Sequence, residues 1–395
     1  MINEKMFALG DAPNKIREIY AYGLERKAQI GEENVFDLSI GNPSVPSPAQ
    51  IDETIERIAA HSDGTIHKYT PSPGLDWVRQ AVADNLNARF GTRYDSGNLY
   101  LTSGASSAIA ICCKAIALPG EEVIVNTPYF PEYRTWTENA GAVCREVPTR
   151  ADDFQLDIDA LAAAITPKTA AVIVNSPNNP VGAVYTPDNL RALADLLRAR
   201  SGEYGHVIYL ISDEPYRELV YGDAQVSWMP SLYDATLVCY SWSKSFSLPG
   251  ERIGYVLVPD NMPDFEHVYK AVCGGGRTLG YICDSTLFQT VIAKCVDAPV
   301  DAEPYARNRA LLTEGLDRIG YTYVEPDGAF YLWIKALEDD AEAFCERAKN
   351  YELLLVPSTC FSATGWVRAG YCASEQAIRG SLGAFQALFD EYQGR

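Results

Sequence analysis

The sequence predicts an α/β protein with a large domain and a smaller one. Its 395 residues, of which 47% are hydrophobic, are too many for one small core. From about Leu99 onward, apolar runs of strand length alternate with turns and helical patterns. Runs this apolar indicate strands covered on both faces, and hence a mainly parallel sheet between helices.

The elements of the large domain are expected to follow one another through the middle of the chain. Apolar runs predict strands at residues 123–126, 142–147, 170–175, 207–212, 236–240 and 253–258. Helical patterns lie between several of them, at residues 106–117 and 187–200. Pro187 opens the second of these helices, where a proline loses no hydrogen bond.

The C-terminal third has a different, α+β pattern. Helices are expected at residues 306–319, 338–350 and 375–392, and strands at 322–324, 329–334 and 366–369. We therefore expect three segments: an N-terminal arm over residues 1–45 that packs with the small domain, a large domain over 46–285, and a small domain over 286–395.

The composition argues against several classes of function. The net charge of −19, from 33 basic and 52 acidic residues, repels nucleic acid, although a local basic cluster can still bind a small anion. The ten cysteines include no C-x-x-C pair, so we expect free thiols in a reducing compartment and no metal site. Residues 1–16 lack an apolar signal region, and no apolar run reaches the roughly 18 residues that span a bilayer. We expect a cytoplasmic protein with no membrane partner.

Three predicted strands end in distinctive polar residues. The run AVIVN leads into SPNNPVG, VIYLIS leads into DEPY, and TLVCY leads into SWSK. If the strands are parallel, their carboxyl ends share the edge of the sheet at which α/β proteins bind ligands. That edge would gather Asn179, Asp213, Tyr216, Ser241 and Lys244. Each residue alone is ordinary turn or surface material, so only the combination indicates a site.

Pyridoxal 5′-phosphate (PLP) fits this set of side chains. Its aldehyde needs an amine such as Lys244, and its ring nitrogen needs a carboxylate such as Asp213 to stay protonated. A tyrosine hydroxyl and an asparagine amide can donate hydrogen bonds to its ring oxygen. Its phosphate can bind at the expected helix start TSGAS, residues 102–106, with Arg252 as a bidentate partner.

Three motifs together resemble those of a known family. SPNNPVG, DEPY and SWSKSFSLPGERIG occur in the order and at the separations of the fold-type I PLP enzymes of the class I/II aminotransferase family, of the aspartate aminotransferase kind. The resemblance extends from the SIGNP segment at residues 39–43 to WVR at 366–368. It implies a seven-stranded sheet in a PLP-binding large domain and a homodimer. It also implies amino-group transfer between an α-amino acid and a 2-oxo acid by a ping-pong mechanism.

The resemblance also implies roles for the residues that match. Lys244 would hold PLP as a Schiff base and move the α-proton of the substrate, and Asp213 would bind the ring nitrogen. Tyr216 and Asn179 would contact the ring oxygen, with Asn179 also beside the substrate. Tyr129 would stack on the ring, although a core tyrosine is a competing interpretation. The phosphate site would comprise Ser103, Gly104, Ala105, Ser241, Ser243 and Arg252.

Three further residues would bind substrate or complete a neighbouring site. Gly41 and Arg368 resemble the pair that receives the α-carboxylate of the substrate. Tyr69, in HKYTPSPG, resembles the tyrosine that reaches the phosphate site of the neighbouring subunit, which requires at least a homodimer.

The substrate side chain is less well defined by the sequence. Many bacterial aspartate aminotransferases of this family have a lysine at the position that aligns with Ser106, and a neutral serine cannot pair with a distal carboxylate. Arg277 could replace that cation, although it is equally well interpreted as a surface arginine. Its neighbours, the glycines at 274–276, indicate a mobile or closely approached backbone. Dicarboxylic, aromatic and small neutral amino acids stay open, with a slight preference for aspartate or glutamate.

Other functions on a similar fold are weaker alternatives. A PLP-dependent carbon–sulfur β-lyase would share every cofactor motif, because both reactions begin with removal of the α-proton. A regulator that keeps the fold as a ligand sensor would carry an additional basic DNA-binding domain, and only a short arm precedes the enzyme-like segment. A dehydrogenase is disfavoured because no strand is followed by G-x-G-x-x-G.

Overall fold

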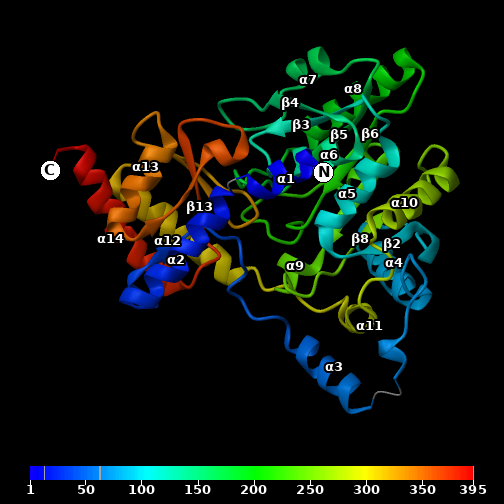
Figure 1. Cartoon of the computed structure of the whole chain (residues 1–395), viewed down its shortest axis with the longest axis horizontal. Helices are drawn as coiled ribbons and strands as arrows, with labels where there is room; N and C mark the ends of the chain where they lie inside the picture. Colours follow the sequence, from blue (N-terminus) through cyan, green and yellow to red (C-terminus); the bar gives the residue numbers. More distant parts are fainter. Residues whose placement is uncertain (13, 62–63, 395) are drawn as a thin grey trace. The chain divides into compact units, whose positions relative to one another are not determined.

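The described residues of the computed structural model, 1–12, 14–61 and 64–394, form two compact units (Figure 1). The larger unit comprises Pro43–Pro304 and Pro326–Ala329. The smaller unit comprises Met1–Asn42, Tyr305–Glu325 and Phe330–Arg395. We expected the large domain to end at residue 285, whereas the larger unit continues through Pro304.

A seven-stranded sheet forms the centre of the larger unit. Its strands lie in the order β2 (Leu99–Thr102), β8 (Gly254–Leu257), β7 (Thr236–Ser241), β6 (Tyr209–Asp213), β5 (Thr169–Asn175), β3 (Glu122–Thr127) and β4 (Val143–Pro148). Only β8 runs antiparallel to its neighbours β2 and β7, and the other adjacent pairs are parallel. The expected α/β fold with a mainly parallel sheet is therefore confirmed.

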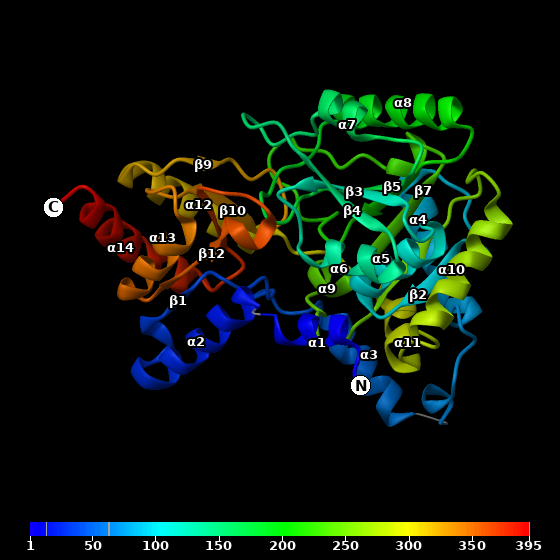
Figure 2. The ribbon, with the colours of Figure 1, turned by 45° about the horizontal axis from the view of Figure 1, so that its top comes forward.

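Helices cover both faces of this sheet. Figure 2 shows α7 (Ile158–Ala164) and α8 (Pro187–Tyr204) on one side, and α5 (Gly104–Ile116) and α10 (Phe265–Leu279) on the other. The remaining helices of this unit are α3 (Ala49–Ala60), α4 (Asp76–Phe90), α6 (Glu132–Ala140), α9 (Trp242–Ser245) and α11 (Thr286–Cys295). Strands β5 and β7 are buried along their whole length, which explains their long apolar runs, whereas the edge strand β4 is partly exposed.

Local sequence accounts for helix α8. The side chain of Thr186 accepts a hydrogen bond from the backbone N–H of Asn189 and so caps the helix, and Pro187 occupies its first position. The chain leaves the helix at Gly205, which has a left-handed φ of 73°. Leucines at positions 190, 193 and 197 recur at helical spacing and are buried against the sheet.

The glycine run at 274–276 lies inside helix α10, which the sequence did not indicate. A Cβ atom at Gly275 would lie 2.9 Å from the carbonyl oxygen of Ile111, and one at Gly276 would collide with the hydroxyl of Tyr100. The glycines therefore allow α10 to pack closely on α5 and β2, and this close approach outweighs their low helix propensity.

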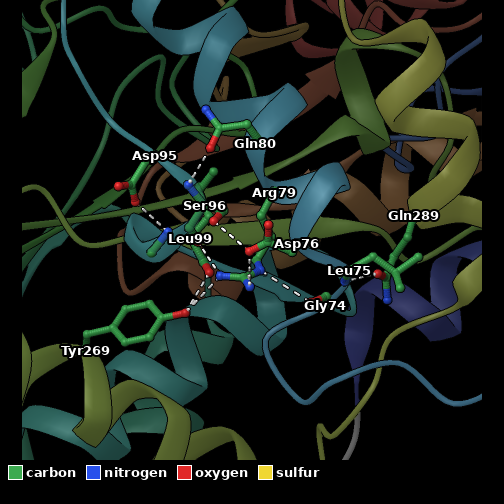
Figure 3. Close-up of polar contacts among 11 residues, drawn as sticks. Gly74, Leu75, Asp76, Arg79, Gln80, Asp95, Ser96, Leu99, Tyr269 and Gln289 are labelled. Carbon is green, nitrogen blue, oxygen red and sulfur yellow. Dashed lines mark hydrogen bonds and ion pairs between the residues drawn. The ribbon is translucent and has the colours of Figure 1, made fainter.

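A guanidinium joins three segments at the start of strand β2 (Figure 3). Nε of Arg79 donates to the carbonyl oxygen of Gly74 at 3.3 Å, and Nη1 donates to the carbonyl oxygen of Ser96 and to the hydroxyl of Tyr269. Nη2 bonds the carboxylate of Asp76 at 3.2 Å. These bonds fix the turn that precedes α4 and the approach to β2, whose end leads into the TSGAS segment.

The smaller unit combines helices with short strands. An antiparallel sheet has the order β12 (Val356–Pro357), β13 (Trp366–Gly370), β10 (Tyr331–Lys335) and β9 (Tyr323–Val324). Strand β1 (Phe36–Asp37) pairs in parallel with β11 (Leu353–Leu354). The helices are α1 (Glu4–Asp11), α2 (Lys15–Ile30), α12 (Glu303–Ile319), α13 (Ala341–Ala348) and α14 (Glu375–Tyr392). Helix α13 is shorter than the expected 338–350 because Asp340 caps its start through bonds from Glu342 and Ala343.

The N-terminal segment contacts the C-terminal part of the smaller unit. Nε of Arg26, on α2, donates to the carboxylate of Glu352 at 3.1 Å, and Lys27 pairs with Asp37 at 3.2 Å. The pairing of β1 with β11 attaches the chain just after α2. Helix α1, by contrast, has no buried residue.

The ten cysteines are all free thiols, and seven of them are buried. Among the described residues, no helix is long and apolar enough to cross a membrane.

Candidate active site

The polar residues expected at one edge of the sheet do follow adjacent parallel strands. Asn175 at the end of β5 is in register with Asp213 at the end of β6, and Asp213 is in register with Cys239 of β7. The loop after β5 carries Asn179, the turn after β6 carries Tyr216, and the one-turn helix α9 after β7 carries Lys244. The parallel register therefore brings all three segments to the same edge.

Asp213 is a buried carboxylate whose two oxygen atoms have different hydrogen-bonding surroundings. It is 6% exposed, and its Oδ2 accepts a hydrogen bond of 2.5 Å from the hydroxyl of Tyr133. Its Oδ1 is buried without a hydrogen-bond partner among the described residues. Burial raises the pKa of Asp213 to about 7, against the opposing effect of the Tyr133 bond, and the charge of Glu214 raises it further. Oδ1 can therefore accept a hydrogen bond from a cationic N–H donor.

Asn175 links the loop after β5 to strand β6. Its Nδ2 donates to the carbonyl oxygen of Asp213 at 3.0 Å, and its Oδ1 accepts from the backbone N–H of Asn179 at 2.8 Å. The SPNNP turn, with cis peptide bonds before Pro177 and Pro180, is therefore fixed relative to the carboxylate. The sequence indicated Asn179 but not this role of Asn175.

A candidate anion-binding cradle lies at the start of helix α5. The helix begins at Gly104, with a φ of 80°, and the side chain of its N-cap residue Ser103 makes no capping bond. The guanidinium of Arg252 donates to the carbonyl oxygen of Ser103 at 3.0 Å and to that of Pro249 at 3.1 Å. A guanidinium beside the positive end of a helix attracts a phosphate group. Ala105 continues the helix, and the expected partners Ser241 and Ser243 are buried.

Helix α9 is held by the side chain of Tyr240, on the preceding strand β7. The hydroxyl of Tyr240 lies 2.8 Å from the hydroxyl of Ser245, the residue after Lys244, and donates to the carboxylate of Glu218 at 3.0 Å. Lys244 itself is partly buried. These contacts restrict the position of its backbone.

In the smaller unit, Gly41 and Arg368 both adjoin the ring of Tyr331. Arg368, on β13, is 3% exposed, and its Nη2 donates to the carbonyl oxygen of Ser39 at 2.7 Å. Its guanidinium lies 4.3 Å from the ring centre of Tyr331 and 4.9 Å from that of Phe361. A Cβ atom at Gly41 would collide with the hydroxyl of Tyr331. The two residues that the sequence pairs are therefore close to a common neighbour.

Comparison with known proteins decides the family. Residues 33–382 match the model of aminotransferase class I and II. The chain belongs to this family. Its members depend on PLP, so PLP is the cofactor of this aminotransferase. The open Oδ1 of Asp213 fits the ring nitrogen of PLP, and the cradle at Gly104 and Arg252 fits its phosphate.

Similar proteins support this assignment over nearly the whole chain. The aspartate/prephenate aminotransferase of Thermus thermophilus is 33% identical over 383 residues, which cover 94% of this chain and 95% of the relative. An aminotransferase structure from Eubacterium rectale is 48% identical with a TM-score of 0.96 and covers 99% of both chains. The structure of Thermus thermophilus aspartate aminotransferase with maleate is 31% identical with a TM-score of 0.87, and covers 98% of this chain and 99% of that one.

The surroundings of three predicted site residues of the aminotransferase give less support to their expected roles. Tyr129 is buried, and its hydroxyl donates to Glu146 at 2.7 Å. Tyr69 is 97% exposed, an unusual state for a large aromatic side chain. Arg277 is exposed in the last turn of α10, and Ser106 is half-buried in the first turn of α5.

Sequence reasoning missed Tyr133, the hydrogen-bond donor to Asp213. This tyrosine lies in the first turn of α6, four residues after Tyr129 in the segment NTPYFPEY. The aromatic spacing in that segment was the available signal, but it did not indicate a partner 80 residues further along the chain.

Proposed function

We propose that this aminotransferase moves an amino group between an α-amino acid and a 2-oxo acid in two half-reactions of a ping-pong cycle. We further propose a slight preference for aspartate- and glutamate-type substrates. The observation that carries the first proposal is the buried carboxylate of Asp213, whose Oδ1 has no partner among the described residues. A carboxylate in such surroundings is costly unless a cation completes it.

The larger unit would orient the cofactor. Oδ1 of Asp213 binds the ring nitrogen, Tyr216 and Asn179 bind the ring oxygen, and Tyr129 stacks on the ring. The start of α5 and Arg252 bind the phosphate. When bound, PLP acts as an electron sink for negative charge at the substrate α-carbon. The buried position of Asp213 supports this arrangement, because water is excluded from the carboxylate that keeps the ring nitrogen charged.

Lys244 would be the base and acid of both half-reactions. Its Nζ takes the α-proton from the substrate and delivers it to the cofactor, and the reverse transfer occurs with the second substrate. The contact of Ser245 with Tyr240 supports this role, because a proton transfer needs an amine held within reach of two carbon atoms.

Arg368 would bind the α-carboxylate of every substrate, with Gly41 beside it. The contacts with Tyr331 and Phe361 hold the plane of its guanidinium, and a fixed fork is well suited to bidentate binding of a carboxylate. Gly41 contributes by lacking a side chain that Tyr331 would exclude.

The preference for a dicarboxylic substrate rests on two observations. The Thermus thermophilus relative is named an aspartate/prephenate aminotransferase, and the structure of its aspartate aminotransferase contains maleate, a dicarboxylate. Because Ser106 carries no charge, Arg277 would supply the cation for the distal carboxylate.

We also propose that the enzyme is a cytoplasmic homodimer. The exposed ring of Tyr69 supports the dimer, since a second copy would cover it and receive its hydroxyl at the phosphate site. The ten free thiols support a reducing compartment.

A single-turnover experiment tests the proposed function. The PLP-bound enzyme is mixed with a panel of amino acids, and absorbance follows conversion of the cofactor to its pyridoxamine form. Each responding amino acid is then paired with pyruvate, 2-oxoglutarate and oxaloacetate. Lys244→Ala is expected to slow the half-reaction by at least about a hundredfold, while Lys270→Ala, at an exposed position of α10, leaves it unchanged. Wild-type transamination by Lys244→Ala would refute the assignment.

The same enzyme preparation distinguishes transamination from β-elimination. Release of pyruvate and ammonia from cystathionine without an added 2-oxo acid would mark a carbon–sulfur lyase. Accumulation of the pyridoxamine form after addition of an amino acid alone marks an aminotransferase.

A further inference from the structure

The bond between Tyr133 and Asp213 makes the two oxygens of a cofactor-site carboxylate unequal. Oδ2 accepts the tyrosine hydroxyl at 2.5 Å, and Oδ1 has no partner within the described part of the chain. A carboxylate can rotate about its Cβ–Cγ bond, and a hydrogen bond to one oxygen opposes that rotation. The bond therefore also determines the direction of the other oxygen.

Tyr133 is itself rigidly held. It is 2% exposed, and its ring lies 6.2 Å from that of Tyr129 at an interplanar angle of 11°. The rings of Phe130 and Trp136 lie at 5.8 Å and 6.1 Å, both steeply inclined to it. Its backbone N–H donates to the carbonyl oxygen of Phe130 at 3.1 Å. Packing on several sides restricts the ring and so helps to hold the hydroxyl at Asp213.

The bond also stabilises the charged form of the carboxylate. Burial raises the pKa of Asp213, and the tyrosine hydrogen bond opposes that rise. Titratable groups that also interact with Asp213 include Glu214, next in the chain, and Cys239 on the adjacent strand β7. Neither of them donates a hydrogen bond to the carboxylate among the described contacts, whereas the Tyr133 hydroxyl is a neutral donor to it.

We propose that Tyr133 is a positioning residue that turns Oδ1 of Asp213 toward the ring nitrogen of PLP and keeps the carboxylate ionised. The proposal rests on the proposed function, because it assigns that nitrogen to Asp213. Tyr133 acts through the carboxylate and touches neither the substrate nor the reacting atoms.

Tyr133→Phe tests the proposal because it removes one hydroxyl and keeps the packed ring. PLP labelled with ¹⁵N at the ring nitrogen is bound to wild-type enzyme and variant, and its chemical shift is followed against pH. In the variant, Oδ1 is no longer held toward the ring nitrogen, so the nitrogen is expected to lose its proton at a pH about one unit lower. The half-reaction is expected to slow about tenfold. An unchanged ¹⁵N titration would overturn the proposal.

Tyr233→Phe is the matched control. Tyr233 is also a buried tyrosine of the larger unit, and its hydroxyl donates to the carbonyl oxygen of Ile208 at 2.6 Å, at the other end of β6. Its loss is expected to lower stability and leave the ¹⁵N titration unchanged. Equal ¹⁵N shifts in both variants would show a purely structural effect and would also overturn the proposal. The titration needs bound PLP but no turnover, so it is read separately from any failure of the proposed transamination.

Discussion

Nη2 of Arg252 donates to the carbonyl oxygen of Ser103 at 3.0 Å, directly beside Gly104. A Cβ atom at Gly104 would lie 2.6 Å from this same nitrogen, and the residue has a left-handed φ of 80°. Arginine and glycine are therefore complementary: the guanidinium can occupy the helix start only because no side chain does. This relationship supports the proposed phosphate site.

Gly104→Ala is expected to damage this cradle. The left-handed conformation costs a non-glycine residue about 1–2 kcal/mol, and the methyl group displaces the guanidinium. We expect the free energy of unfolding to fall by that amount, and the dissociation constant of PLP to rise at least about tenfold. Chemical denaturation and equilibrium dialysis measure the two quantities.

Gly202→Ala provides the comparison for that variant. Gly202 lies in helix α8, with no atom within 4 Å of an added Cβ. An alanine there raises helix propensity and is expected to stabilise the protein without affecting PLP. A normal PLP affinity of Gly104→Ala would contradict the proposal that Gly104 and Arg252 form the phosphate site.

Asp213→Asn is expected to stabilise the protein without PLP in a pH-dependent manner. Burial raises the native pKa of Asp213 to about 7, above its ordinary value. Between roughly pH 4 and pH 7 the native state therefore binds more protons than the unfolded state, and its stability falls as pH rises. The asparagine removes this cost, so the stability advantage of the variant should grow through that window and level off above it.

Urea denaturation of the PLP-free proteins at several pH values measures that advantage. Asp195→Asn, at an exposed carboxylate of α8, reports the effect of removing a surface charge. With PLP bound, the wild-type protein should be more stable than Asp213→Asn, because the ring nitrogen pairs with the aspartate and not with the amide. A constant stability difference between pH 4 and pH 8 would rule out the buried titration.

The sequence predicts those parts of the fold that depend on local pattern. Helix α14 spans Glu375–Tyr392, as expected, because Ser374 caps it and one face is apolar throughout. The glycine run of α10 could not be predicted to be helical, since its helical state depends on the distant Ile111 and Tyr100. The glycine run does indicate a closely approached backbone, but the local sequence does not show which distant residues approach it.

The residues of the candidate site also divide into those that a local sequence motif indicates and those that it does not. Lys244 and Asp213 could be predicted as site residues because strand-end motifs indicate them together. Tyr133 was missed because its partner is 80 residues away, and a tyrosine in an aromatic segment is most simply a core residue. Only the three-dimensional structure distinguishes a tyrosine whose hydroxyl is used from one that merely packs.

Tyr69 is expected to act in the active site of a second subunit. Tyr69→Ala and Lys244→Ala would each be inactive or nearly so at limiting PLP. In a mixed dimer of the two variants, one site has both native residues if Tyr69 acts across the interface. Random reassociation should therefore restore about a quarter of wild-type activity.

Activity assays after unfolding and refolding the two variants together measure this restoration. Refolding each variant alone is the control. Because Tyr69 is 97% exposed, its replacement is not expected to unfold the subunit. Failure of the mixture to exceed the separate variants would place Tyr69 outside the neighbouring site.

Arg277 is expected to select dicarboxylic substrates. Arg277→Ala removes the only cation that we assign to the distal carboxylate, and the loss of a charged hydrogen bond should reduce kcat/KM for aspartate about 10- to 100-fold. The value for tyrosine should change little, because an aromatic side chain has no distal carboxylate. Half-reaction rates with both amino acids measure this ratio.

Arg191→Ala, at another exposed arginine, controls for the loss of a surface charge. An equal decrease for both substrates would assign Arg277 to general binding, and no decrease would leave it a surface residue.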